Sequence, residues 1–340
     1  MTDGGSGVAR RTCAGPLTGR AYHAAMRIAA AQTHPAWLDP IRTADIVADW
    51  IGRASREGVD LLAFGETFVG GYPLWVSMTD GARFDDPDQK RAFAAYLDAA
   101  VEIDGQVVAT IVEAARDHGV FTYVGVAERG TGTARGTVFA TLVAIDPARG
   151  VVSAHRKLMP TYEERLVWGT GDGHGLRVHP GPAGFRVGGL NCWENWMPLA
   201  RTAMYAGGED LHVAVWPGGT DLTRDITRFI AREGRVYVLS AGQLNNVEDI
   251  PDSFPLAAAV REGLGQGRSE DGGSCIAGPD GEWIVPPVAD TEQLVCADID
   301  VARVREERQN FDPTGHYARP DVLRLDVTRR RLAAVEFEDA

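Results

Sequence analysis

Short apolar runs typical of buried strands alternate along this chain with segments whose apolar residues recur at helical spacing. Residues 27–32 and 59–64 are the first two such runs. Between them, residues 47–54 carry apolar side chains at positions i, i+3, i+4 and i+7, which predicts an amphipathic helix ending at Gly58. Because strands and amphipathic helices must bury their apolar faces against other elements, this alternation predicts layers of sheet and helix.

Hairpins interrupt the alternation in the middle of the chain. Further strands are predicted at 120–126, 138–145, 151–155, 185–191, 211–216, 236–241, 273–277 and 294–299, and further helices at 108–115, 199–206 and 223–232. This mixture of βαβ units and hairpins favours an α/β sandwich with mixed sheets over a doubly wound parallel sheet. Residues 246–272 are rich in Asn, Pro, Ser, Gly and acidic residues, and predict one long loop.

A single domain with two tails accounts for the length. The 340 residues are 44% hydrophobic, enough to bury a sizeable core. Residues 1–25 show no apolar period and are predicted to be a disordered N-terminal extension. No break in composition divides the remainder, so we expect one domain over 26–325 and a C-terminal tail over 326–340.

Charge excludes several classes of partner. The chain has 34 basic and 47 acidic residues and a net charge of −13, which argues against binding to nucleic acid or to an anionic membrane. The run 329–331 is too short to change this. Neither a signal-peptide core nor an 18-residue apolar stretch occurs, and four cysteines do not make a disulfide framework. We therefore expect a soluble cytoplasmic protein with reduced cysteines.

Three reactive side chains follow predicted strands directly. Glu66 follows the strand at 59–64, Lys157 the strand at 151–155, and Cys192 the strand at 185–191. In open α/β folds the carboxyl ends of strands converge on a crevice, where these side chains would meet. Together they form a nucleophilic set: the thiol attacks, the carboxylate takes its proton, and the ammonium stabilises developing negative charge.

Each of these residues also has a structural interpretation. A cysteine at a strand end is often a small buried hydrophobe, as expected for Cys275 and Cys296, a glutamate in a turn is usually solvated, and a lysine usually extends to solvent. Only two lysines occur in the chain, however, and Lys90 is explained as a solvated charge at a helix start. Because a helix start and a nearby ammonium lower a thiol's pKa, we expect a lowered pKa for Cys192.

The segments around these residues resemble known motifs. Phe64–Pro73, His155–Gly173 and Asn191–Arg201 resemble the three signature segments of the nitrilase superfamily, and Asp312–Asp321 resembles the closing segment of true nitrilases. The resemblance extends from Arg27 to about residue 325. The Cys-Trp-Glu sequence at 192–194 is similar to the nitrilase branch, whereas amidase branches usually differ there.

The resemblance implies a fold, an assembly and roles. It implies an αββα four-layer sandwich that forms a homodimer or a larger oligomer such as a spiral. It makes Glu66 the general base, Lys157 the charge stabiliser and Cys192 the nucleophile. The family's second glutamate corresponds to Glu164, which would hold Lys157 or the substrate; an exposed helix carboxylate beside Glu163 is the alternative.

Two positions depart from the family's pattern. Many relatives have Pro where this chain has Gly65 before the glutamate, which we expect to loosen the turn without removing the carboxylate. At 137–141 the chain has Thr-Val-Phe-Ala-Thr where relatives often carry Tyr-Asn. We expect this second departure to alter support for the site and not its chemistry.

The implied reaction is hydrolysis of a small nitrile to the carboxylic acid and ammonia through a thioimidate and a thioester. No metal or organic cofactor is implied, and neither HExxH, Walker A nor GxGxxG sequences occur. Five aromatic residues flank the motifs and either line a substrate pocket or pack in the core: Tyr72, Trp75, Trp168, Trp193 and Trp196. If they line it, an aromatic or arylaliphatic nitrile is favoured.

Three other functions remain open at this stage. An amidase or N-carbamoyl hydrolase of the same superfamily would use the same three residues. A binding or filament-forming relative would have a silent site. An unrelated hydrolase with the same residue types on a Rossmann-like sheet is less favoured, because its acidic residue normally follows the first strand whereas Glu66 follows the second.

Overall fold

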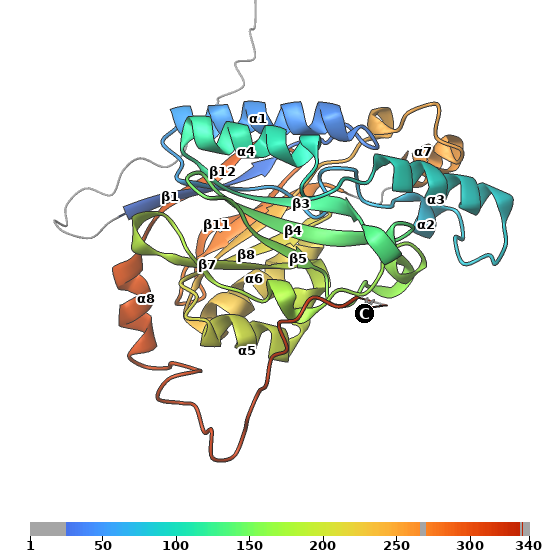
Figure 1. Cartoon of the computed structure of the whole chain (residues 1–340). Helices are drawn as coiled ribbons and strands as arrows, with labels where there is room; N and C mark the ends of the chain where they lie inside the picture. The colour runs from blue at the N-terminus through green and yellow to red at the C-terminus, as the bar shows by residue number, and fades with distance from the viewer. Residues whose placement is uncertain (1–24, 266–269, 334, 336–340) are drawn as a thin grey trace, which may run out of the picture.

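Two six-stranded sheets pack face to face in the computed structural model, and helices cover their outer faces (Figure 1). The structure describes residues 25–265, 270–333 and 335. The layers run helix, sheet, sheet, helix, so the predicted four-layer αββα sandwich with mixed sheets is confirmed. The extension predicted over residues 1–25 lies outside the described residues except at Ala25.

The first sheet is mixed. In spatial order it contains β12 (Gln293–Asp300), β1 (Ala25–Gln32), β2 (Leu61–Ala63), β3 (Phe121–Arg129), β4 (Val138–Asp146) and β5 (Gly150–Arg156). Strands β1, β2 and β3 are parallel, whereas β12, β4 and β5 pair antiparallel with their neighbours. The predicted hairpin between β4 and β5 is present at 146–150.

The second sheet has a parallel centre. In spatial order it contains β11 (Trp283–Ala289), β10 (Gly272–Ala277), β9 (Tyr237–Gly242), β8 (Leu211–Trp216), β7 (Arg186–Asn191) and β6 (His179–Pro180). Strands β7, β8 and β9 are parallel, so their carboxyl ends lie at one edge. The outer strands β6, β10 and β11 are antiparallel.

Amphipathic helices close the two outer faces. Helices α1 (Pro40–Arg56) and α4 (Gln106–His118) pack on the first sheet, and α5 (Pro198–Ala206) and α6 (Thr220–Gly234) pack on the second. The side chain of Asp39 caps the start of α1 by accepting a hydrogen bond from the Arg42 amide. Helix α4 ends at Gly119, whose φ of +70° is the left-handed cap that glycine provides.

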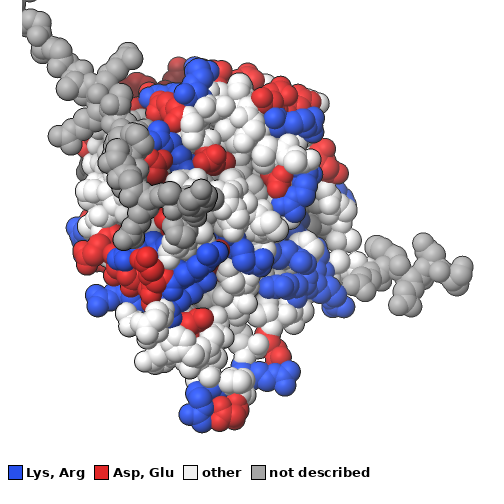
Figure 2. Space-filling model, turned by 90° about the vertical axis from the view of Figure 1, so that its left-hand side faces the viewer, with Lys and Arg blue, Asp and Glu red and all other residues white. Residues whose placement is uncertain are grey.

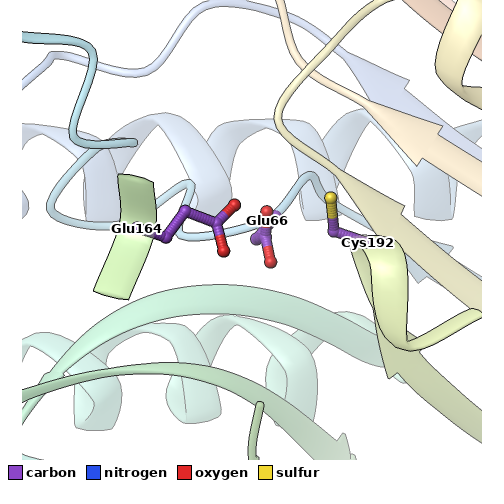
Figure 3. Close-up of side chains that lie close together, drawn as sticks. All are labelled: Glu66, Glu164 and Cys192. Carbon is purple, nitrogen blue, oxygen red and sulfur yellow. The ribbon is translucent and has the colours of Figure 1, made fainter. Parts of the chain in front are cut away.

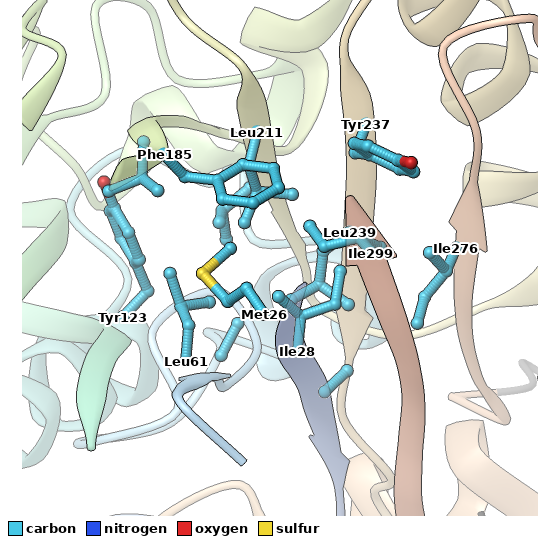
Figure 4. Close-up of a cluster of buried hydrophobic side chains, with 14 of the residues drawn as sticks. Met26, Ile28, Leu61, Tyr123, Phe185, Leu211, Tyr237, Leu239, Ile276 and Ile299 are labelled. Carbon is cyan, nitrogen blue, oxygen red and sulfur yellow. The ribbon is translucent and has the colours of Figure 1, made fainter. Parts of the chain in front are cut away.

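The space between the sheets is the main core (Figure 4). Apolar residues from the inner faces of both sheets meet there, and all are fully or almost fully buried: Met26, Ile28, Leu61, Tyr123, Phe185, Leu211, Tyr237, Leu239, Ile276 and Ile299. Burying such side chains contributes about 1.5–3 kcal/mol each, which makes this layer a major source of stability.

Several elements differ from the sequence-based expectation. The loop predicted at 246–272 contains a helix, α7 (Ala257–Gly265), and the sequence analysis also missed α2 (Trp75–Met78), α3 (Pro87–Ala99), α8 (Val301–Arg308) and β11. Helices α2, α3 and α7 share a separate apolar cluster at one end of the molecule. They bury their apolar residues against each other, so their pattern along the chain is weak. No helix among the described residues is long and apolar enough to span a bilayer.

Candidate active site

Three strand ends from the two sheets bring a carboxylate, an ammonium and a thiol together. Glu66 lies just beyond β2, Lys157 directly follows β5, and Cys192 directly follows β7 on the other sheet. All three side chains are almost fully buried. One carboxylate oxygen each of Glu66 and Glu164 and the Cys192 Sγ lie within 4.8 Å of one another (Figure 3). The residues predicted from the strand ends therefore occupy one site.

Lys157 lies between two carboxylates. Its Nζ donates hydrogen bonds to Glu66 Oε1 at 2.9 Å and to Glu164 Oε2 at 2.6 Å. Glu164 is only 3% exposed, so it is a buried partner of the ammonium and not an exposed helix carboxylate. It accepts two further hydrogen bonds, from the Thr161 amide at 2.6 Å and from the Tyr72 hydroxyl at 2.8 Å. These bonds fix the position of the Lys157 ammonium.

Burial sets the protonation states of the cluster. Burial raises the pKa of Glu66 to about 8, against the nearby Lys157 charge, and the Glu164 charge adds to the increase. Although burial opposes its charged form, the pKa of Lys157 is raised because three potential anions surround it. The pKa of Cys192 is raised well above its usual range by burial and by Glu66, which outweigh Lys157. The lowered thiol pKa predicted from the sequence is therefore wrong, and the thiol needs a base to remove its proton.

A tight turn presents the Cys192 thiol. Cys192 begins the 3-10 turn η5 (Cys192–Trp196) with a φ of +45°, an uncommon conformation for a residue with a side chain. Asn191 occupies the N-cap position of the turn, and the Glu194 side chain accepts a hydrogen bond from the Asn191 amide at 2.9 Å. The Asn195 side chain donates to the Cys192 carbonyl at 2.9 Å and accepts from His212 at 2.7 Å. Buried side chains thus hold the turn from both ends.

Glu194 joins the nucleophile turn to the lysine segment. Its carboxylate accepts from the Leu158 amide at 2.6 Å and lies 3.1 Å from His155 Nε2, both of which flank Lys157. Despite complete burial, these partners lower the pKa of Glu194, so it carries its charge. The sequence analysis did not identify Glu194 as a link between these two segments. The spacing of Asn191 and Glu194 is that of a capping box, which predicts the hydrogen bond from the Asn191 amide.

Gly65 is required by a close approach of the two sheets. A Cβ at this position would lie 2.8 Å from the Trp216 carbonyl oxygen and 2.9 Å from Gln243 Oε1. The Glu66 amide donates to the same Trp216 oxygen at 3.0 Å. The turn is therefore tightly held, and the expectation that glycine loosens it is wrong. Gln243, also missed from the sequence, is fully buried, and neither atom of its amide has a partner among the described residues.

The five aromatic residues named from the sequence occupy different places. Trp168 lies under the cluster, with Lys157 Nζ 5.3 Å from its ring centroid, and Tyr72 packs edge-on against it at 5.5 Å. Trp75 is 1% exposed and packs in the core against Tyr96 and Phe254. Trp193 and Trp196, in the nucleophile turn, are about half exposed, with ring centroids 6.0 Å apart.

The other cysteines and the possibility of a metal site remain to be described. Cys275 is a buried free thiol whose pKa burial raises to about 11. Cys296 is disulfide-bonded, contrary to the reduced state expected for it. Glu66, Glu164 and Cys192 have the residue types of a metal site, but Lys157 donates to both carboxylates and already neutralises charge there. The arrangement suits acid–base and nucleophilic chemistry.

Comparison with known proteins identifies relatives along most of the chain. The family model for carbon-nitrogen hydrolases matches residues 27–309. An aliphatic nitrilase from Rhodococcus rhodochrous is 36% identical over 92% of this chain and 86% of its own length. Nitrilase 1 from Arabidopsis thaliana is 33% identical over 95% and 92%. A bifunctional nitrilase/nitrile hydratase from Oryza sativa subsp. japonica is 36% identical over 93% and 88%.

Solved structures share the fold at lower sequence identity. A carbon-nitrogen hydrolase from Helicobacter pylori G27 superimposes with a TM-score of 0.65 and 16% identity, covering 87% of this chain and 96% of its own. A double mutant of the amidase from Nesterenkonia sp. AN1, in complex with acrylamide, gives a TM-score of 0.61 at 21% identity over 87% and 98%. At these identities the similarity establishes the fold alone.

Proposed function

Because this chain belongs to the carbon-nitrogen hydrolase family, we propose that it is a nitrilase, which hydrolyses an organic nitrile to the carboxylic acid and ammonia. The observation that carries this proposal is the buried cluster in which Lys157 bonds both Glu66 and Glu164 beside the Cys192 thiol. Curated relatives named nitrilases, 32–37% identical over most of the chain, support nitriles as the substrate class.

The first stage forms a covalent adduct. Glu66 takes the proton of the Cys192 thiol, and the sulfur attacks the nitrile carbon as the nitrile nitrogen gains a proton, which gives a thioimidate. A pKa of about 8 suits Glu66 to this exchange, because a base works best with a pKa near the working pH. The Lys157 ammonium and the Trp193 backbone N–H are the donors placed to stabilise the negative charge that develops on nitrogen.

The second stage releases both products. Glu66 deprotonates a water that adds to the thioimidate carbon, and the nitrogen leaves as ammonia after gaining protons, which leaves a thioester on Cys192. A second water, activated in the same way, cleaves the thioester to the acid and restores the thiol. Collapse of the first tetrahedral intermediate by loss of sulfur would give an amide instead. The ratio of acid to amide therefore depends on how well Lys157 and Glu164 favour departure of nitrogen.

A panel of nitriles and their matching amides tests the proposal. We expect ammonia and acid from nitriles, and an intact mass increase on the wild-type protein trapped during turnover. The Cys192→Ala variant should show neither turnover nor adduct. Turnover of amides alone would assign the protein to the amidase or N-carbamoyl hydrolase alternative. Activity that survives in Cys192→Ala would refute the mechanism in which Cys192 is the nucleophile. No activity in the wild type would favour a binding or filament-forming relative.

The proposal includes the surroundings of the site. Tyr72, Trp168, Trp193 and Trp196 would contact the substrate or its entrance, which favours an aromatic or arylaliphatic nitrile. The enzyme would be cytoplasmic, act without a cofactor or metal, and assemble as a homodimer or larger oligomer. Its domain would extend over 26–325, with a tail over 326–340.

A further inference from the structure

A second hollow, separate from the active site, is lined by α5 and by the edge strands β5 and β6 of the two sheets. It has a volume of about 650 Å³ and is formed by one side of α5, the segment 174–179, the start of β7 and the C-terminal segment 325–329. None of the residues in the catalytic cluster lines it. Its volume lies within the range of small-molecule sites, roughly 300–1,000 Å³.

Positive charge dominates the lining of this hollow. Arg177, Arg186 and Arg329 line it together with His174 and His179, and no lining residue is acidic. None of the three arginines forms an ion pair with a carboxylate of the described residues, although the chain has a net charge of −13. Figure 2 shows that basic side chains gather in a band on one face of this acidic molecule.

Backbone oxygens hold two of the guanidinium groups in place. Arg177 Nε donates to the His174 carbonyl at 2.7 Å, and Arg186 donates to the Gly207 carbonyl through Nε at 3.3 Å and Nη2 at 2.7 Å. Each group keeps further N–H donors that bond no described residue. Fixed donors lose little conformational entropy when a ligand binds, and guanidinium groups bind phosphate and carboxylate oxygens in a bidentate manner.

His179 is a buried polar side chain without a hydrogen-bond partner among the described residues. It is 9% exposed and contacts the hollow. Burial and the charges of Arg149, Arg177 and Arg186 lower its pKa to about 4. Its imidazole is therefore neutral at neutral pH, with a free N–H donor. Asp146 opposes this decrease in the pKa of His179.

Much of the remaining lining of the hollow is apolar. Six lining residues offer only aliphatic surface: Val152, Val178, Ala203, Ala206, Leu325 and Val327. Arginines beside aliphatic side chains suit an organic molecule that carries an anionic group and a hydrocarbon part.

From the unpaired arginines, the buried imidazole and the aliphatic lining residues, we propose that this hollow binds a small organic anion with two or more negative charges, carried by phosphoryl or carboxylate groups. The inference does not depend on the proposed nitrilase function, because the hollow shares no residue with the catalytic cluster. The shared chemistry is an oxyanion held by Arg177, Arg186 and Arg329.

Calorimetric titration of the full-length protein with pyrophosphate and with citrate, each at matched ionic strength, tests the proposal. We expect saturable binding of at least one probe, and the tighter probe identifies phosphoryl or carboxylate groups as the preferred chemistry. Arg186→Gln and Arg329→Gln should each weaken this binding about tenfold, since each removes a charge-assisted contact. Arg329→Gln is the safer variant for folding, because its side chain bonds no described residue.

An exposed arginine on the far side of the molecule supplies the control. Arg42 on α1 has no side-chain partner among the described residues, so Arg42→Gln changes the net charge equally without touching the hollow. Its affinity for the probes should match the wild type. The proposal is overturned if neither probe binds saturably at low millimolar concentration, or if Arg42→Gln weakens binding as much as Arg329→Gln. The readout is binding, so it is independent of nitrile turnover.

Discussion

Replacing Glu164 with glutamine should move the acid limb of the pH dependence of kcat/KM to lower pH. Carboxylate oxygens of Glu164 and Glu66 lie within 4.8 Å of each other, and the Glu164 charge helps to raise the pKa of Glu66 to about 8. At an effective dielectric constant of about 20, a charge at this distance is worth about 3 kcal/mol. At about 1.4 kcal/mol per unit, its removal should lower the pKa of Glu66 by about 2 units.

The direction of the change follows from the proposed role of Glu66 as a base. A base acts in its ionised form, so wild-type kcat/KM should fall as the pH drops through about 8. In Glu164→Gln the same fall should occur near pH 6, because the base stays ionised for about 2 units further. Measuring kcat/KM of the wild type and of Glu164→Gln for one uncharged nitrile across this pH range gives the acid limb of each protein. The glutamine carbonyl still accepts from Lys157, so the geometry of the ammonium is preserved.

Tyr72→Phe is the matched control for this experiment. It removes the hydrogen bond to Glu164 Oε1 but keeps the charge, so its acid limb should stay close to that of the wild type. An unchanged limb in a correctly folded Glu164→Gln variant would refute the electrostatic reasoning. Equal shifts in both variants would also refute it, because the effect would then come from hydrogen bonding and not from charge.

Three further substitutions probe the construction of the site. Gly65→Ala should lower the free energy of unfolding by about 1–3 kcal/mol in urea titrations, because its Cβ would collide with the Trp216 carbonyl. Gly136→Ala, which meets no atom within 4 Å, should leave stability nearly unchanged. Because the pKa of Glu194 is lowered in the folded protein, its ionised carboxylate stabilises the fold at pH values above the pKa of an unfolded glutamate, which is near 4. This stabilisation is lost as the pH falls through the pKa of the folded protein. Acid unfolding of Glu194→Gln should therefore depend less on pH than that of the wild type. Lys157→Arg should reduce kcat by about 10²–10³, since a planar guanidinium cannot replace a compact ammonium between two buried carboxylates, and single-turnover kinetics would measure this loss.

Hydrophobic spacing predicted the elements that bury one face on a sheet. Strands β1, β3, β4, β7, β8, β9, β10 and β12 and helices α1, α4, α5 and α6 all lie within a few residues of their predicted positions. Strand β11 was missed because it lies at a sheet edge, where Pro286 and Pro287 interrupt the pattern. Helix α7 was missed because its buried residues belong to a cluster assembled from distant parts of the chain, so the burial that stabilises it is set by tertiary structure.

The grouping of Glu66, Lys157 and Cys192 was predictable because each one follows the end of a strand, and the edge of a sheet gathers such positions. The protonation states were not predictable by the same route. A sequence shows that a lysine accompanies Cys192, but not that the thiol is 2% exposed or that Glu66 carries a competing charge beside it. Burial reverses the expected direction of the thiol's pKa. This supports the proposed role of Glu66, because a thiol that stays protonated needs a base beside it to accept the proton. Glu194 shows the same limit, since its partners Leu158 and Asn191 come from different sheets and meet only in the folded chain.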